Sequence, residues 1–456
     1  MASSGFVSRR TLLAAATAGI AGVGMAGCGS SSGSSSGGGG GGKVSLTYGL
    51  WDPTEQVGYQ TVIEEFQKRN PNISVTIQQT PGANYQQKIE ANYVTETAPD
   101  VFWVNAPYLS DWIDKGIIVD VAPMIARDKI DLSIYYPALV KLHQKGDKTY
   151  GLPRNWDTIG LYYNKDYFKQ RGIIIPKDLA WDPSSGGSYL EFLKELTVDT
   201  KGKNASSAAF DAADVKTYAV TVANSMQTDY LNYLAMNGSG ILSDPYSSTV
   251  IFDQEAGVQT FEYLTNLINV EHVAVPGSEL GQHAAGSTAL SLFGKGRVAM
   301  YQSGDWTATS IQSSVDFAVG IMQLPRGPKG SISVYNGGID GINSTSKHPD
   351  EAWELVKFLG SADAQQIMAK GGYLWPGIKS VDHFYKEHWA DKGIDVQPFQ
   401  DASDGDVYNY PISSGMGQAT TAITEALGTA YTGAESAQSA VKKAAAGARS
   451  ALEAAR

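Results

Sequence analysis

The chain has 456 residues, 42% of them hydrophobic and 18% charged, and its 46 acidic and 35 basic side chains give a formal net charge of −11. This composition is typical of a folded globular protein and excludes a disordered or collagen-like chain. The acidic balance argues against nucleic acid as a partner. With one cysteine, the chain can form neither an internal disulfide nor a cysteine-based zinc finger.

The first residues have the pattern of an export signal. Arg9 and Arg10 stand before the apolar run 12–26, which is shorter than the roughly 20 residues needed to span a bilayer. The paired arginines resemble a twin-arginine signal, and the Met-Ala-Gly-Cys sequence that ends at Cys28 resembles a bacterial lipobox. We therefore predict a lipoprotein signal peptide over residues 1–27 and a lipid on Cys28. The alternative is an ordinary apolar N-terminus with an idle cysteine.

A spacer follows the signal. Residues 29–42 consist of Gly and Ser alone, a composition that behaves as a flexible coil with a reach of roughly 20 Å. With the lipidated cysteine, this segment (28–42) would tether a folded body to a membrane. We expect the protein to be exported and lipid-anchored to the outer face of the cytoplasmic membrane, since so acidic a surface gains no membrane affinity of its own.

The body, residues 43–456, exceeds the roughly 250–300 residues at which single cores stop growing, so two lobes are expected. Apolar residues alternate over 44–50 and 73–77, a strand pattern, and recur at helical spacing over 59–66. The apolar run 101–104 indicates a buried strand. Strand and helix signals that alternate in this way predict an α/β fold with parallel strands covered by helices. The Ala-rich stretch after Gly433 predicts a terminal helix.

Motifs spread over the body carry a resemblance to a known family. They are Phe66–Val75, Pro99–Phe102, Gly116–Asp120, Tyr150–Pro153, Leu161–Phe168, Phe293–Met300, Gly304–Trp306, Glu351–Leu359 and Gly371–Pro376. In order and spacing, behind a lipobox, they resemble the extracellular solute-binding proteins of bacterial ABC importers, in the sugar-binding group that includes maltose-binding protein.

The resemblance implies an α/β, two-lobed periplasmic-binding-protein-like fold of type II, with a ligand cleft between lobes joined by hinge crossings. On this basis lobe 1 would comprise 43–156 plus 341–382, and lobe 2 would comprise 157–340 plus 383–456. Ligand clefts between lobes and at the carboxyl ends of strands are also a general expectation for such folds.

A sugar presents C–H faces and hydroxyl edges, so its site needs aromatic rings together with carboxylates, amides or Arg. Trp51 and Asp52 follow the first strand and are candidates; the alternative is a Trp that packs on the core and an Asp that caps a helix. Asn105 follows the buried strand, where the family has a polar ligand contact; the alternative is a turn residue.

The resemblance supplies further candidates. Asp157 matches a carboxylate that contacts sugar in the maltose-binding branch, with Arg154 as a partner for its charge. Trp306 matches the family's aromatic platform, and Gln227 lies where the second lobe supplies contacts. Asp305 could accept ligand hydroxyls or cap the helix that follows.

The remaining candidates are two glycines and a tryptophan. Gly337 and Gly338 lie near the second predicted hinge, where glycine would allow close approach of a ligand or hinge rotation. Trp375 stands before a proline in the last motif.

The function implied is capture of a sugar and its delivery to ABC permease subunits, without bond chemistry. We expect a monomer with no cofactor, no metal and no nucleic acid partner, and we read Asp401, Asp404 and Asp406 as a solvated acidic turn. One alternative keeps the fold but changes the ligand to a polyamine, peptide or polyol. The other is an extracellular glycoside hydrolase, which would need two carboxylates facing across a cleft.

Overall fold

The computed structural model describes residues 43–281 and 285–455. The predicted signal peptide, the lipidation site at Cys28 and the Gly/Ser tether lie outside the described residues. None of the helices within the described ranges has both the length and the apolar character that crossing a bilayer requires.

The first sheet is built around parallel strands near the start of the body. Its strands, in spatial order, are β13 (Asp406–Asn409), β12 (Ile332–Ile342), β3 (Val101–Asn105), β1 (Val44–Leu50) and β2 (Ile73–Gln79), and β6 (Pro153–Asp157) also pairs with β12. β1 runs parallel to β2 and β3, whereas β12 runs antiparallel to β3 and β6. The strands predicted over 44–50, 73–77 and 101–104 are therefore confirmed.

Helices bury their apolar faces against this first sheet. They are α1 (Pro53–Arg69), α2 (Gly82–Val94), α3 (Ala106–Asp114), α4 (Ala122–Asp128), α13 (Pro349–Leu359) and α14 (Ala362–Lys370). In α1 the residues at helical spacing, Tyr59, Val62, Ile63 and Phe66, are all buried, which confirms the predicted amphipathic helix.

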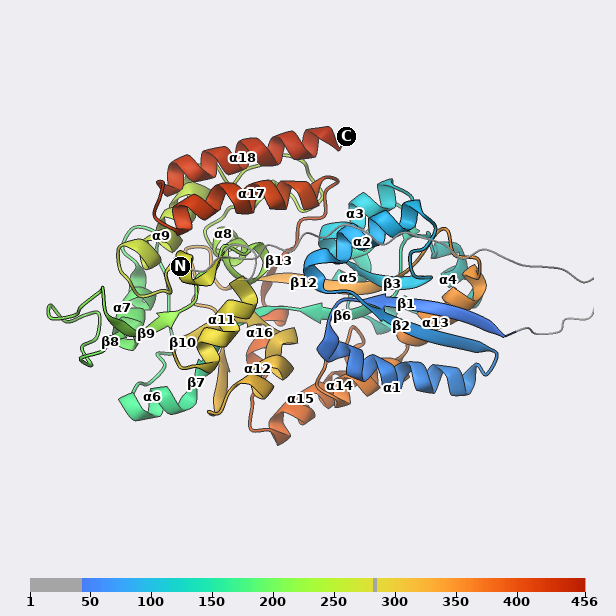
Figure 1. Cartoon of the computed structure of the whole chain (residues 1–456), viewed down its shortest axis with the longest axis horizontal. Coiled ribbons are helices and arrows are strands. Elements are labelled where there is room, and N and C mark those ends of the chain that lie inside the picture. The colour runs from blue at the N-terminus through green and yellow to red at the C-terminus, as the bar shows by residue number, and fades with distance from the viewer. Residues whose placement is uncertain (1–42, 282–284, 456) are drawn as a thin grey trace, which may run out of the picture. The chain divides into compact units, whose positions relative to one another are not determined.

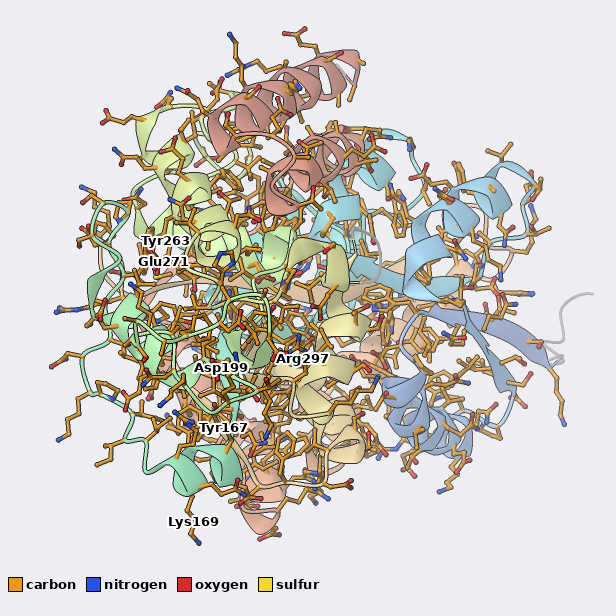
Figure 2. All side chains as sticks on the ribbon, turned by 60° about the vertical axis from the view of Figure 1, so that its left-hand side comes forward. Tyr167, Lys169, Asp199, Tyr263, Glu271 and Arg297 are labelled. Carbon is orange, nitrogen blue, oxygen red and sulfur yellow. The ribbon has the colours of Figure 1, made fainter. Side chains whose placement is uncertain are left out.

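The second sheet has mixed strand directions. Its order is β11 (Val319–Met322), β7 (Ile159–Asn164), β10 (Val298–Gly304), β9 (Val215–Val220) and β8 (Val198–Asp199). Arg297, labelled in Figure 2, precedes β10 and donates hydrogen bonds to the carbonyls of Val215 and Lys216. Its guanidinium carbon also lies 4.8 Å from the ring centre of Tyr218, so this side chain adds contacts to the backbone pairing of β9 with β10.

Helices of the second lobe surround this sheet on the left of Figure 1. They are α6 (Lys165–Arg171), α7 (Gly187–Leu196), α8 (Leu231–Met236), α9 (Glu255–Asn269), α10 (Gly277–Leu280), α11 (Ala285–Gly294), α12 (Ala308–Ser314), α17 (Met416–Tyr431) and α18 (Ala437–Ala454). α17 and α18 pack side by side, and buried alanines of α18 share a core cluster with α9. The terminal helix predicted from the Ala-rich stretch is thus confirmed as α18.

Two strand connections link the lobes. β6 belongs to the first sheet and is followed after one residue by β7 of the second. β12 begins beside α8, where the Val334 amide donates to the Asn232 side-chain oxygen (2.8 Å), and pairs with β3 at its end. An aromatic cluster that contains Trp156, Tyr335 and Trp375 packs against these crossings, together with α5 (Pro137–Leu142), α15 (Asp382–Asp391) and α16 (Gln397–Asp404). The short hairpin β4 (Gln144–Lys145) and β5 (Lys148–Thr149) lies between α5 and β6 in the chain.

The predicted lobe boundaries stay a prediction. β12 runs across the boundary placed between 340 and 341, and β13 pairs within the first sheet although it falls in the segment assigned to lobe 2. The α/β class itself, with two separate sheets, agrees with the sequence-based expectation.

Candidate functional site

A cavity of about 320 Å³ lies between the lobes. Its size is at the lower end of the range of roughly 300–1,000 Å³ that is usual for small-molecule sites. The sequence-predicted residues that line it are Trp51, Asp52, Asn105, Asp157, Gln227, Trp306 and Gly338. Of these, Gln227 and Trp306 come from the second lobe, and the others come from the strands and helices of the first sheet.

Two of these residues also cap helices, which for Asp52 is the alternative weighed from the sequence. Asp52 accepts hydrogen bonds from the amides of Thr54 (2.7 Å) and Glu55 at the start of α1. Asn105 accepts from the amide of Ala106 (2.7 Å) at the start of α3. Because β1 and β3 are parallel neighbours, their carboxyl ends bring both caps to the same side of the cavity.

A buried arginine lies among these residues. Arg154 is only 4% exposed, and its guanidinium carbon lies 3.9 Å from the ring centre of Trp103. Its Nε donates to the Asn155 side-chain oxygen (3.2 Å), while Nη1 has no hydrogen-bond partner among the described residues. A buried donor without a partner is costly, and the same side chain lines the cavity.

Three buried carboxyl groups, those of Asp157, Glu55 and Asp305, have raised pKa values. Burial raises the pKa of Asp157 to about 6, and the charge of Arg154 opposes that rise. Burial likewise raises the pKa of Glu55 to about 8, so this side chain carries a proton at neutral pH. The pKa of Asp305 is raised by burial first and by the charge of Asp157 second. The cavity lining thus offers both donors and acceptors.

The ring of Trp306 lies against the end of β10, in the space that a side chain at Gly304 would occupy. A Cβ atom on Gly304 would lie 1.7 Å from Cζ3 of the Trp306 ring, so only glycine permits this ring position. The Gly304 carbonyl accepts hydrogen bonds from the hydroxyls of Thr307 (2.7 Å) and Tyr162 (3.0 Å). These contacts fix the turn η3 (Asp305–Thr307) that carries the tryptophan.

Three predicted ligand contacts do not line the cavity. Trp375 is fully buried, with its ring centre 4.5 Å from that of Trp156, because it fills the aromatic cluster between the lobe crossings. Asp305 is 1% exposed and accepts a hydrogen bond from the amide of Thr158 (3.0 Å). Gly337 pairs with Trp156 across the strands, whereas its neighbour in sequence reaches the cavity.

Sequence reasoning missed other lining residues. Glu55, Asn155 and Tyr108 face the cavity although no motif singled them out. Glu55 lies in the first turn of α1, one turn after the predicted Asp52, so helical spacing was a usable signal. Asn155 donates to the Asp157 carboxylate (2.7 Å) and orients it, which follows from their alternate positions on β6.

The acidic segment with Asp401, Asp404 and Asp406 shows no metal-binding arrangement. Asp401 accepts a hydrogen bond from the Gln397 side chain (2.9 Å) within α16, and Asp406 begins β13. Across residues 43–281 and 285–455, no group of three or more His, Cys, Asp or Glu side chains could hold a metal ion. The expectation that the protein needs no metal or cofactor stays a prediction.

Comparison with known proteins identifies the family. The family described as bacterial extracellular solute-binding protein matches residues 61–394, and the chain belongs to it. Its relatives include the multiple sugar-binding protein of Streptococcus mutans, 24% identical over 71% of this chain and 73% of the relative, and the lactose-binding protein of Rhizobium radiobacter, 24% identical over 80% and 78%.

Solved structures agree with this assignment. UspC of M. tuberculosis has a TM-score of 0.72 and 26% identity, with 90% of this chain and 100% of that chain covered. The ABC substrate-binding protein Lmo0181 of Listeria monocytogenes, in complex with cycloalternan, has a TM-score of 0.78 and 18% identity, with 90% and 99% covered. These likenesses confirm the predicted two-lobed fold and the resemblance on which it rested. That the chain lacks enzyme activity stays a prediction.

We predict that Trp375→Ala destabilises the protein rather than removing a ligand contact. Loss of a fully buried indole should lower the free energy of unfolding by about 3–5 kcal/mol, measured by urea denaturation. An unchanged denaturation midpoint would contradict the burial of this ring in the aromatic cluster.

We predict that Gly304→Ala displaces the ring of Trp306, because the added methyl group would overlap it. The displacement should change the near-ultraviolet circular dichroism and the tryptophan fluorescence while the far-ultraviolet spectrum stays the same. Gly405→Ala is the matched control, since a Cβ atom there meets only ordinary contacts. Identical aromatic spectra for Gly304→Ala and the unmodified protein would show that the glycine does not hold the ring.

Proposed function

We propose that this protein is the substrate-binding lipoprotein of an ABC transporter, which captures a sugar in the interlobe cavity and delivers it to membrane permease subunits. The observation that carries the proposal is the lining of that cavity. The rings of Trp51 and Trp306 can pack on the C–H faces of a sugar, while the Asp157 carboxylate and the Arg154 guanidinium line the same cavity and can hydrogen-bond to its hydroxyls.

The charge of the lining favours a neutral ligand. Arg154 is the one cation that lines the cavity in the described part of the chain, and Glu55 and Asp157 lie near it. A phosphorylated ligand would need several such cations. The relatives point the same way: one is named a galactooligosaccharide-binding protein, and neighbouring structures hold acarbose or maltotriose.

Delivery requires that ligand binding change the arrangement of the two lobes. A ligand that contacts Trp306 on one lobe and Trp51 on the other would favour the arrangement in which both contacts are made together. The predicted lipid on Cys28 would keep the body near the permease, and we propose that the body acts as a monomer.

The alternative ligands and the hydrolase have less support. All carboxylates that line the cavity among the described residues, Asp52, Glu55 and Asp157, come from the strands and helices of the first sheet. A glycosidase needs two carboxyl groups that flank the bond to be cleaved. A polyamine remains the best rival ligand, since acidic and aromatic groups also bind cations.

The experiment that tests the proposal is a thermal-shift screen of the purified protein against mono- and oligosaccharides, polyamines and peptides. A ligand that binds the folded state raises the melting temperature in proportion to the logarithm of its concentration over Kd. We expect saccharides to raise it. A shift from polyamines or peptides, with none from any saccharide, would overturn the proposed ligand.

We predict that Trp306→Ala weakens saccharide binding roughly 100-fold, about 2.7 kcal/mol, because the sugar face loses its aromatic partner. Isothermal titration calorimetry measures the change, and Trp306→Phe should retain part of the affinity. Affinity that is unchanged in Trp306→Ala would remove this residue from the site.

We predict that saccharide affinity falls as the pH is lowered from 7 through about 6 to 5, because Asp157 then gains a proton and loses its capacity as a charged acceptor. In the ligand-free protein the raised pKa of Asp157 acts on stability in the opposite direction. Because ionisation is harder in the folded state than in the unfolded state, the contribution of Asp157 to the free energy of unfolding decreases as the pH rises from about 4 to about 6.

Asp157→Asn is the control for this pH dependence, because the amide does not titrate while the neighbouring Arg154, Glu55 and Asp305 are retained. Its affinity should be lower at pH 7 and change less between pH 7 and 5. Equal pH profiles for the two proteins, measured by calorimetry, would mean that Asp157 does not contact the ligand as a carboxylate.

A further inference from the structure

A chain of buried hydrogen bonds lies beside Arg154 but outside the lining of the interlobe cavity. The indole Nε1 of Trp103 donates to the hydroxyl of Tyr48 (2.7 Å), and that hydroxyl donates to Oδ1 of Asp340 (2.7 Å). Trp103 and Tyr48 are fully buried, Asp340 is 2% exposed, and none of the three lines the cavity. These side chains can therefore influence a bound ligand only through the residues around them.

Strand pairing brings the three side chains together. Tyr48 lies on β1, Trp103 on β3 and Asp340 on β12, and these strands are neighbours in the first sheet. Asp340 pairs with Trp103 across β12 and β3. Tyr48 pairs with Val101, which precedes Trp103 by two residues. Because side chains two residues apart on a strand point to the same side, all three lie on one face of the sheet.

The ring of Trp103 carries the guanidinium of Arg154. The ring centre lies 3.9 Å from the guanidinium carbon, within the range of a cation–π contact. Nε of Arg154 donates to the Asn155 side-chain oxygen (3.2 Å), so the guanidinium is held between that bond and the indole. A rotation of the indole would therefore move the cation in the cavity lining. The bond to Tyr48 opposes such a rotation, because it fixes the one donor that an indole has.

Asp340 adds a negative charge to this arrangement. Burial raises the pKa of Asp340, while the charge of Arg154 and the hydrogen bond from Tyr48 oppose that rise. Burial also acts against the charge of Arg154, yet Tyr59 and Asp340 are among the groups that hold the pKa of Arg154 above its ordinary value. The Tyr48 hydroxyl is thus bonded both to a counter-charge of Arg154 and to the ring on which Arg154 packs.

We propose that Tyr48 and Asp340 are positioning residues for ligand binding, which keep the guanidinium of Arg154 in place. They act through the ring of Trp103. The inference rests on the proposed function and extends it to residues that do not line the cavity. Hydrogen bonds that lock the residues behind a binding site hold that site in its productive geometry. Loss of the Tyr48 hydroxyl would release the indole at one end and leave the buried Asp340 carboxylate without this donor at the other.

The test is the saccharide affinity of Tyr48→Phe, which removes this hydroxyl and keeps the ring. Calorimetry on the purified full chain in detergent uses glucose, galactose, mannose, lactose and maltotriose. For each saccharide that binds the unmodified protein, we expect Tyr48→Phe to raise the Kd about tenfold. Unchanged values would overturn this inference alone, whereas no binding by any saccharide would overturn the proposed function and the inference with it.

Tyr263→Phe is the matched control for the loss of a buried hydroxyl. Tyr263, labelled in Figure 2, is 4% exposed on α9 of the second lobe, and its hydroxyl has no hydrogen-bond partner among the described residues. This variant should leave the Kd unchanged. A rise equal to that in Tyr48→Phe would mean that the effect does not depend on the hydrogen bonds beside Arg154, and would overturn the proposal.

A second background separates positioning from a general loss of stability. Arg154→Lys keeps the charge but loses the planar group that stacks on Trp103. In this background Tyr48→Phe should change the Kd less than threefold, because the contact through which it acts is already lost. A tenfold change in both backgrounds would show that the hydroxyl does not act through the guanidinium, and would contradict the proposal.

Trp103→Phe serves if Tyr48→Phe does not fold. It removes the donor of the same hydrogen bond and keeps an aromatic ring beside Arg154. We expect this variant to raise the Kd about tenfold as well. A folded Trp103→Phe protein with the Kd of the unmodified chain would overturn the inference.

Discussion

The interlobe cavity depends on one buried positive charge, the guanidinium of Arg154. It packs on the ring of Trp103 and lies close enough to Asp157, Glu55 and Asp340 to affect the pKa of each carboxyl. Carboxylates buried without a counter-charge cost several kcal/mol each, so the position of this arginine decides which of them can ionise. Asp157 ionises near neutral pH while Glu55 keeps its proton, and the cavity therefore combines a charged acceptor with neutral and charged donors. That combination matches hydroxyl groups, which both donate and accept.

Strand pairing sets the position of that charge. Gly338 of β12 lies opposite Asn105 of β3 and also opposite Asn155 of β6, so a single residue joins two strands of the first sheet at the floor of the cavity. A Cβ atom at this position would lie 2.6 Å from Nη2 of Arg154, so a larger residue there would displace the guanidinium. The hinge role predicted for this glycine stays a prediction, whereas the structure gives it a packing role, since the arginine occupies the space that a side chain would take.

Site residues could be predicted from the sequence where they follow a strand end or lie in a family motif. Prediction failed where the direction of a side chain determines whether it faces the cavity or the core. Trp51 and Asp52 were predictable because parallel strands present their carboxyl ends together, and the platform position of Trp306 came from the resemblance. Trp375 could not be distinguished from a ligand contact, since a tryptophan before a proline looks the same in sequence whether it packs in a core or a cleft. A second cavity, which lies in the second lobe and is lined in part by Asp229, is formed by residues up to about 90 positions apart in the chain. No local sequence pattern therefore indicates it.

The most direct test of the account is a crystal structure of the protein with the saccharide that most raises its melting temperature. The account predicts a sugar ring packed on Trp306 between the lobes, with hydroxyl oxygens within hydrogen-bonding distance of the Arg154 guanidinium and of the Asp157 carboxylate. A saccharide bound outside the interlobe cavity, or bound within it without contact to any of these three side chains, would contradict the account.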